Sequence, residues 1–181
     1  KLRKLVASRL QASKQQAPHF YLRTSLRVDA LLALRAQLNA AGSDRISVND
    51  FIVKAAAKAL IDMPEMNVVW SEEAVLHAPQ ADVAVAVASD RGLVTPVISG
   101  VEGLSLSALS RRIKDAVARA NDGKLQQSEL EGGTLTISNL GMFGVEEFDA
   151  IINPPQAGIL AVSAGLQKPV VKDGALAIAT V

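Results

Sequence analysis

The segment from Gly132 to Val162 reads GGTLTISNLGMFGVEEFDAIINPPQAGILAV, and it contains the most suggestive chemistry of the chain. A short β-branched run ends at Ser138 and Asn139, and glycines, a Met-Phe pair and an Asn-Pro-Pro sequence follow. No G-x-S-x-G motif surrounds Ser138, so it is not the nucleophile of a hydrolase elbow. No histidine is close in sequence to activate it. Ser138 is therefore interpreted either as a hydrogen-bond donor to an oxyanion or as a structural hydroxyl.

The general bases that could partner this serine are few. His19 and His77 are the two histidines of the chain, and they lie far apart in sequence. His19 follows Pro18 and has no neighbouring carboxylate to orient it, and His77 lies in EEAVLHAP, a hairpin or loop. The chain has no cysteine, which excludes disulfides, a thiolate nucleophile and cysteine-ligated zinc. We therefore expect no metal site, and the residues alone identify no base for Ser138.

The composition is that of an ordinary globular protein. Of the 181 residues, 49% are hydrophobic and 20% are charged, and the net charge is +1. This balance and an aromatic content of 3% argue against a nucleic-acid binder. No apolar run approaches the ~20 residues of a membrane-spanning helix, and no signal peptide is visible. Cytoplasm or an organelle matrix is the expected location, although Lys1 need not be the native start.

The amino-terminal segment is strongly basic. Apolar residues recur at helical spacing until Pro18, which predicts a basic helix or arm over residues 1–18. It would lie on the domain or on a neighbouring subunit, with a phospholipid or RNA surface as the weaker alternative. The following HFYLRTSLRVD alternates as a strand does, and its apolar face would hold Phe20, Leu22, Thr24, Leu26 and Val28.

Three further helices carry clear terminal signals. Asp29 is a candidate N-cap for ALLALRAQLNAAG, which would end at Gly42. Ser47 can cap VNDFIVKAAAKALIDM, with Asp50 in the capping-box position and Pro64 beyond its end. A third, amphipathic helix, LSLSALSRRIKDAVARANDGKL, would end near Gly123.

The strands mix with these helices without regular βαβ alternation. Residues 82–98 predict a hairpin whose first strand carries a face of small alanines, leaving room for a helix or a ligand. Strands are expected at 134–138 and 158–163, and KPVVKDGALAIATV predicts a closing hairpin. The pattern indicates an α/β fold, a two-layer sandwich with a mixed β-sheet. Because ALAIATV is apolar to its last residue, we expect more sequence beyond Val181.

Several segments together resemble the catalytic core of the dihydrolipoamide acyltransferases of 2-oxo-acid dehydrogenase complexes. They cover almost the whole chain in the right order, and the version SNLGMFGVEEFDAIINPPQ is most similar to acetyl-transferring members, of pyruvate or acetoin type. The other matching segments are SKQQAPHFYL, LRAQLN, SVNDFIVKAAAKAL, MNVVW, DVAVAVASDRGLVTPVI and the remainder of residues 132–162.

The resemblance implies a chloramphenicol-acetyltransferase-like fold and a homotrimer, which often assembles into a cubic or dodecahedral core. Lipoyl domains and the dehydrogenase components of the complex would be its partners. Coenzyme A and a lipoyl-lysine arm would enter an intersubunit channel from opposite ends. A histidine would deprotonate the thiol, and a hydroxyl would stabilise the tetrahedral oxyanion.

By motif position Ser138 matches that hydroxyl, with no metal involved. The positions that resemble coenzyme A contacts are Arg35, Ser47 and Asn139, and more loosely Lys124 and Ser163. An arginine suits the anionic phosphates of the nucleotide. The lipoyl side of the channel would be lined by Gly92, Leu93, Thr95 and Pro96. Each position also has an ordinary structural explanation, such as a helix cap for Ser47 or a hairpin return for residues 92–96.

One family feature is missing. The base of the family lies in an H-x-x-x-D-G segment beyond the last hairpin, and this chain has none. We therefore expect that residues 1–181 form an acyltransferase core without its carboxyl-terminal end, inactive as it stands. The alternatives are a non-catalytic homologue within such a complex and a freestanding small-molecule acetyltransferase of the same fold.

Overall fold

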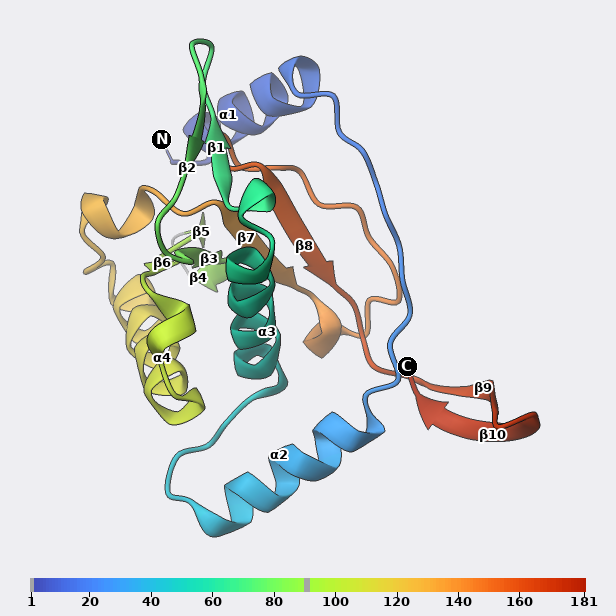
Figure 1. Ribbon diagram of the computed structural model, residues 1–181. Coiled ribbons are helices and arrows are strands. Elements are labelled where there is room, and N and C mark those ends of the chain that lie inside the picture. Colours follow the sequence, from blue (N-terminus) through green and yellow to red (C-terminus); the bar gives the residue numbers. More distant parts are fainter. Residues whose placement is uncertain (1, 90–91) are drawn as a thin grey trace.

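A computed structural model describes residues 2–89 and 92–181 and shows a mixed sheet packed against helices (Figure 1). The sheet has the order β6-β3-β7-β8. β3, β7 and β8 are parallel to one another, and β6 is antiparallel to β3. In chain order these strands are β3 (Val83–Val85), β6 (Val97–Ile98), β7 (Leu135–Asn139) and β8 (Gly158–Val162).

Two helices cover one face of this sheet and form the core with it. They are α3 (Val48–Asp62) and α4 (Leu106–Asp122), which lie side by side in front of the sheet in Figure 1. Burial of their apolar faces removes hydrocarbon from water, the main stabilising contribution to folding. The predicted two-layer sandwich with a mixed sheet is therefore confirmed. The buried cluster comprises Val53, Ala57, Leu60, Ala81, Val83, Val85, Ile98, Val101, Leu109, Ile113, Ala116 and Ile137.

The amino terminus of α3 forms as its sequence predicts. Ser47 Oγ accepts a hydrogen bond from the Asp50 backbone N–H at 3.1 Å. The Asp50 carboxylate in turn accepts from the Ser47 N–H at 2.7 Å, which completes the capping box. Two backbone donors that the helix itself cannot satisfy are thereby paired. This fixes the start of α3 in space, a point that matters for the site.

The predicted cap of α2 (Asp29–Ala41) is wrong at its first residue. Gly42 ends the helix as expected, but Val28 occupies the N-cap position and Asp29 is already helical. The Asp29 carboxylate instead accepts a hydrogen bond from the Thr180 N–H at 3.0 Å, a contact across the fold. This bond lowers the pKa of Asp29 because it stabilises the ionised form. A tertiary partner has therefore replaced the local one.

Residues 18–28 are extended, but they form no strand within the described chain, so that prediction is also wrong. They link α1 (Leu2–Gln16) to α2, and Val28 N–H donates to Thr180 O at 2.9 Å. The expected alternation is absent, since residues 20–27 are all exposed and Phe20 and Leu22 reach 82% and 84%. The apolar side chains of the segment therefore lie on the surface.

The predicted hairpin of residues 82–98 is interrupted in its middle. β3 pairs with β6, while β4 (Val87–Ser89) pairs with β5 (Gly92–Val94) in a separate ribbon. Pro96 lies between β5 and β6 and has no N–H for the ladder, although its carbonyl still accepts from Val85 N–H at 3.0 Å. Ala86 N–H turns instead to Ile137 O at 2.9 Å. Two of the expected turn residues, 90 and 91, lie outside the described residues.

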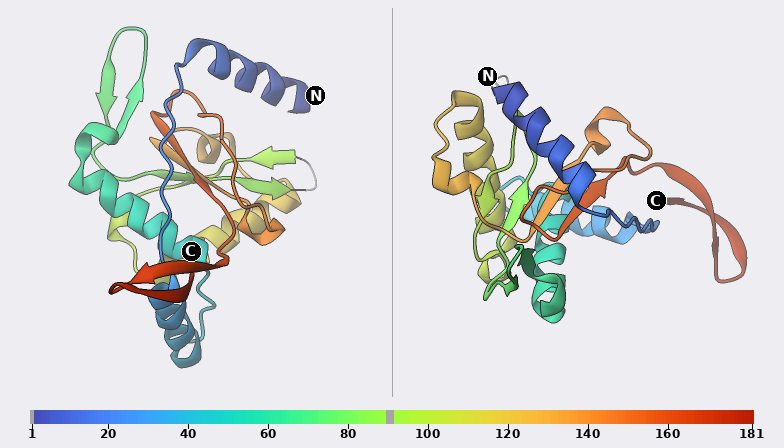
Figure 2. Two further views of the ribbon diagram at one scale, coloured as in Figure 1. Left: turned by 90° about the vertical axis from the view of Figure 1, so that its right-hand side faces the viewer. Right: turned by 90° about the horizontal axis from the view of Figure 1, so that it is seen from above.

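Two other hairpins project from the body. β1 (Val68–Trp70) and β2 (Val75–His77) are tied to the sheet through buried Asn67, whose side-chain amide bonds Ala78 O, Gln80 O and the Thr134 hydroxyl. β9 (Gln167–Lys172) and β10 (Ala175–Thr180) form the predicted closing hairpin, which extends away from the other elements in the right view of Figure 2. No helix in the described part of the chain is long and apolar enough to cross a membrane. Short 3₁₀ turns are η1 (Pro64–Met66), η2 (Val101–Gly103), η3 (Gln127–Leu130) and η4 (Gly141–Phe143).

Lys54 joins the two layers and yields a stability prediction. Its ammonium donates to the carbonyl oxygens of Val101, Glu102 and Leu104 at 3.1, 2.7 and 2.7 Å. Lys54→Met should lower the free energy of unfolding by about 1–3 kcal/mol, because it removes the partner of carbonyl groups between α3 and η2. Urea unfolding would measure the change.

Lys58→Met on the same helix is the matched control. Lys58 pairs with Asp62 at 2.9 Å, and both side chains are largely exposed. That loss should stay below about 1 kcal/mol. Equal effects of the two substitutions would contradict the role assigned to Lys54.

Candidate functional site

The three parallel strands bring the candidate residues to the side of the sheet where the strands have their carboxyl ends, called the carboxyl edge below. β3, β7 and β8 end at this edge, and ligands of open α/β sheets bind outside such carboxyl ends. Ser138 and Asn139 are the last residues of β7, paired with Ala161 and Val162 of β8. Ser163 follows β8 directly. Ser138, Asn139 and Ser163 therefore lie together, as the motif pattern suggests.

Ser138 and Asn139 do not face the same side of the sheet. Side chains alternate along a strand, and Ile137 is fully buried in the core with α3 and α4. Ser138 must therefore point to the opposite face, where the preceding Thr136 bonds Gln156. Asn139 returns to the helix face, where it contacts Asn49 of α3. Adjacent in sequence, these two groups serve two different surfaces.

The face that carries Ser138 has small side chains next to the serine, with Ile159 and Val97 further along it. Ala84 lies beside Thr136 in the ladder, and Ala161 lies beside Ser138. The Ser138 hydroxyl makes no hydrogen bond to any described residue, yet no buried side-chain oxygen there lacks a partner. The Oγ atom is therefore accessible from outside the protein. An unengaged hydroxyl on a small-residue surface can donate a hydrogen bond to a reacting group.

The helix face of the same edge holds Asn139 through both ends of its amide. Asn139 Nδ2 donates to Asn49 Oδ1 at 3.1 Å, and Gly141 N–H donates to Asn139 Oδ1 at 2.9 Å. Asn49 lies in the first turn of α3, next to the capping box of Ser47. The edge of the sheet and the amino end of α3 are therefore one connected region.

Arg35 reaches this region from α2. Its Nε donates to Ile46 O at 2.9 Å, and the Asn39 amide bonds both backbone groups of Ile46. These contacts place Arg35 next to Ser47. Within the described residues Arg35 forms no ion pair, so its charge can still meet an anion. A helix amino terminus also favours negative charge.

Two other residues predicted to contact the nucleotide fare differently. Ser163 is close to the site, because an added Cβ at Gly141 would lie 2.9 Å from Ser163 O. Lys124 follows the end of α4, is exposed and pairs with Asp122 at 2.7 Å. None of its described contacts reaches the edge of β7 or the start of α3. Its role stays a prediction that no contact supports.

The residues expected to line the lipoyl side divide between the base and the outer part of the β4–β5 ribbon. The Pro96 carbonyl accepts a hydrogen bond from Val85 N–H. Ala86, which follows Val85, donates its N–H to the carbonyl of Ile137, the residue before Ser138. Thr95 and Pro96 therefore lie at the base of the ribbon, one strand away from β7. Gly92 pairs with Ser89 at the outer end, and Leu93 is 48% exposed.

Neither histidine is placed to act on Ser138. The two ring nitrogens of His19 contact Ala17 O at 2.8 Å and Ile152 N–H at 3.0 Å, so both are engaged. His77 lies exposed on β2 against Pro64 O at 3.2 Å. Within the described residues no group of three or more acidic or histidine side chains could hold a metal ion.

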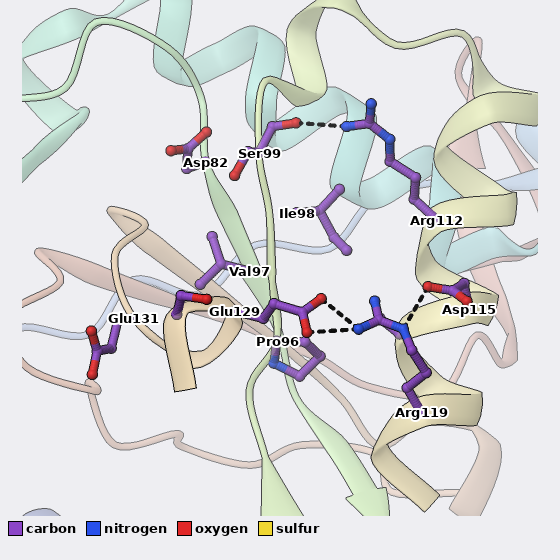
Figure 3. Close-up of a pocket in the computed structure, with 12 residues that line it drawn as sticks. Asp82, Pro96, Val97, Ile98, Ser99, Arg112, Asp115, Arg119, Glu129 and Glu131 are labelled. Carbon is purple, nitrogen blue, oxygen red and sulfur yellow. Dashed lines mark hydrogen bonds and ion pairs between the residues drawn. The ribbon is translucent and has the colours of Figure 1, made fainter. Parts of the chain in front are cut away.

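A hollow of about 400 Å³ lies elsewhere (Figure 3). It is bounded by Asp82 and Ser99, at the end of the sheet opposite to Ser138, and by α4 and η3. Its charges mainly pair with one another, since Arg119 bonds both Glu129 oxygens at 2.6 Å and Asp115 at 2.7 Å. The hydrogen bond from Arg119 lowers the pKa of Glu129, and the same pairing raises that of Arg119. This hollow is an ion-pair network rather than a reaction site.

Comparison with known proteins identifies related chains over the full length. The family model of 2-oxoacid dehydrogenases acyltransferase (catalytic domain) matches residues 1–181. The chain is 48% identical over 183 residues to the dihydrolipoyllysine-residue acetyltransferase component of the pyruvate dehydrogenase complex of Zymomonas mobilis. That alignment covers 99% of the chain but 42% of the relative, so the chain spans less than half the length of such relatives.

Solved structures agree with the architecture. The cubic core of a pyruvate dehydrogenase multienzyme complex superimposes with a TM-score of 0.95 at 28% identity, covering 99% of this chain and 76% of that one. The dihydrolipoamide acetyltransferase of Azotobacter vinelandii gives 0.94 at 27% identity, with coverage of 98% and 75%. That structure was studied for the catalytic roles of a serine, a histidine and an asparagine. The expected chloramphenicol-acetyltransferase-like fold is confirmed by these likenesses.

Asn49 is the residue of this region that the sequence did not single out. It is 90 residues away from Asn139, and its position inside a capped helix start resembles that of any polar surface residue. Only the polar Asn-Asp pair that follows Ser47 and Val48 could have drawn attention to it.

The close approach at Gly141 gives a test of the site geometry. Gly141→Ala would place a methyl group 2.9 Å from Ser163 O and 3.1 Å from Asn139 Oδ1. The backbone of the edge would have to move, and we expect a loss of about 1–3 kcal/mol in unfolding free energy. Gly103→Ala, with nothing within 4 Å, is the control and should be nearly neutral. Equal unfolding midpoints for both variants would mean that the edge is not closely packed.

Proposed function

Because the chain belongs to the 2-oxoacid dehydrogenase acyltransferases, we propose that it transfers an acetyl group between a dihydrolipoyl-lysine arm and coenzyme A. The observation that carries this proposal is the free, accessible hydroxyl of Ser138 at the carboxyl edge of the parallel strands. The name of the Zymomonas relative states that it transfers an acetyl group and that it acts on a dihydrolipoyl-lysine residue.

Ser138 would act on the tetrahedral intermediate rather than as a nucleophile. The coenzyme A thiolate attacks the carbonyl carbon of the acetyl thioester, and the carbonyl oxygen becomes an oxyanion. Ser138 donates a hydrogen bond to this oxygen, which stabilises the developing charge. When the carbonyl re-forms, the dihydrolipoyl sulfur leaves and takes up the proton that the thiol of coenzyme A lost.

The base that carries this proton is neither of the two histidines of residues 1–181. His19 is engaged at both ring nitrogens, and His77 lies on a projecting hairpin. We take the base to be another histidine, contributed across a subunit boundary. The investigation of a serine and a histidine in the catalytic mechanism of the Azotobacter enzyme supports a histidine as the second catalytic group.

We assign coenzyme A and the lipoyl arm to different sides of the sheet, at the carboxyl ends of its parallel strands. Coenzyme A would meet Arg35, Ser47 and Asn139 on the helix side, where a free guanidinium and a helix amino terminus suit phosphate groups. Ser163 would lie at the turn between the faces. The lipoyl arm would pass Thr95 and Pro96 at the base of the β4–β5 ribbon, with Gly92 and Leu93 further out. No metal takes part.

We also propose that copies of the chain associate as a homotrimer, the unit of a larger core that receives lipoyl domains and dehydrogenase components. The likeness to a cubic core supports assembly. The β9–β10 hairpin supports a specific surface, because the outer part of one of its faces is apolar and exposed. Val171 and Leu176 pair on this face at 76% and 78% exposure, beside Pro169 and the 66% exposed Ile178. A two-stranded hairpin is marginally stable alone, so packing on a second copy would stabilise it.

The test of the catalytic role is Ser138→Ala in the full-length protein. We expect kcat to fall about 10²–10³-fold, the range for one oxyanion donor, with the KM for coenzyme A nearly unchanged. Steady-state acetyl transfer to dihydrolipoamide would measure both, with exposed Ser25→Ala as the control.

Three outcomes separate the alternatives. An unchanged kcat would remove Ser138 from the oxyanion role, and a loss confined to KM would make it a binding residue. Absence of transfer in the wild-type full-length protein would favour a non-catalytic structural homologue.

The assembly is tested by a double substitution on the apolar hairpin face. Val171→Ser with Leu176→Ser should shift the protein from trimer to monomer, since burial of each side chain contributes about 1.5–3 kcal/mol. Sedimentation would report the mass, and circular dichroism would report the retained fold. Ala175→Ser, on the opposite face of the hairpin, is the control. A trimer that survives the double substitution would place the contact elsewhere.

A further inference from the structure

Asn49 is held in place by its surroundings before it makes any contact with the site. It is the second residue of α3, between the two members of the capping box, Ser47 and Asp50. These bonds pair the first backbone donors of the helix without help from Asn49. The Asn49 side chain is thus not needed to start α3. Its recorded hydrogen bond is the one that Asn49 Oδ1 accepts from Asn139 Nδ2 at 3.1 Å.

This bond is one of two that hold the Asn139 amide. Asn139 Oδ1 accepts from Gly141 N–H at 2.9 Å, and Nδ2 donates to Asn49. Rotation of the amide by half a turn would set Nδ2 against the Gly141 N–H, a donor against a donor. Gly141 therefore sets the orientation of the amide, and Asn49 restrains its outer end. The two partners together lock the amide.

The Asn139 amide still has one N–H that is not used in a hydrogen bond to the described residues. The Asn139 amide nitrogen carries two hydrogens, and one is used by Asn49. No described residue accepts the second. Asn139 is also only half-buried, at the end of β7 and near Arg35 and Ser47. A fixed donor at this position suits a carbonyl or amide oxygen of an arm that passes along the helix face.

We propose that Asn49 is a positioning residue that acts through Asn139 to bind the amide-bearing arm of coenzyme A. This inference rests on the proposed function and deepens it. Because Asn139 and Ser138 face opposite sides of the sheet, Asn49 affects how the arm is held and not how the oxyanion is stabilised. The structure thereby separates binding on the helix face from chemistry on the other face.

The experiment compares Asn49→Ala with Asn49→Asp in the full-length protein. Asn49→Ala removes the acceptor and should raise the KM for coenzyme A about 3- to 10-fold, the factor for one hydrogen bond, with kcat and the KM for dihydrolipoamide unchanged. Asn49→Asp keeps an acceptor oxygen, so its KM should return to within about twofold of wild type. Asn121→Ala, an exposed asparagine of α4, is the matched control.

A double-mutant cycle shows whether the effect passes through Asn139. Asn139→Ala should raise the KM for coenzyme A, and the double variant with Asn49→Ala should be no worse than Asn139→Ala alone. Additive losses would overturn the proposal. So would an Asn49→Asp variant as impaired as Asn49→Ala, or a change in thermal unfolding with an unchanged KM.

A readout without turnover separates this inference from the proposed function. In the 181-residue chain, the side-chain amide signals of Asn139 can be followed by NMR. Their hydrogen-exchange protection should fall in Asn49→Ala and persist in Asn49→Asp. If wild-type full-length protein transfers no acetyl group, the proposed function fails while this measurement still reports the lock. Protection that is unchanged in Asn49→Ala would reject the lock itself.

Discussion

The strict alternation of side chains along β7 is the constraint on which the site depends. Its parallel pairing with β3 sets Ile137 beside Val85 in the core beneath α3 and α4. Once Ile137 is buried there, the next residue must face away and the one after must return. Ser138 and Asn139 thereby take opposite sides. A slip of one residue in this register would bury the serine and expose the isoleucine.

The separation of faces gives the proposed reaction its layout. On the side of Ser138, the small neighbour Ala161 leaves room at the strand end for the proposed reacting group. The side of Asn139 is polar, and the capped start of α3 brings Arg35, Ser47 and Asn49 to it. Binding of a long, charged arm and stabilisation of a small oxyanion place different demands on the protein. In the proposed layout they fall on two surfaces that share one strand.

The exposed apolar surfaces fit a protein that works as part of an assembly. The exposed apolar side chains of residues 20–26 and of the β9–β10 hairpin both leave hydrocarbon in water. Contiguous exposed patches of this kind mark interaction sites in soluble proteins. The two regions meet where Val28 and Asp29 bond Thr180, so a partner covering one would lie close to the other.

The sequence by itself determined the local features, because each depends on neighbours along the chain. The capping box of Ser47 and Asp50, the end of α2 at Gly42, the closing hairpin and the two-layer class were all predictable from spacing and residue type. The motifs around Ser138 also indicated the family, which the full-length matches confirm.

Tertiary structure decided whatever depends on partners distant in sequence. Asp29 bonds Thr180 instead of capping α2, and residues 18–28 run extended without a strand partner, because the competing contacts come from the other end of the chain. The contact of Asn49 with Asn139 spans 90 residues, and Lys124 lies away from the residues it was grouped with. Sequence spacing shows that side chains alternate along a strand, but it does not show which face of the strand is buried in the core. The opposite orientations of Ser138 and Asn139 followed only once packing had shown which face of β7 is buried.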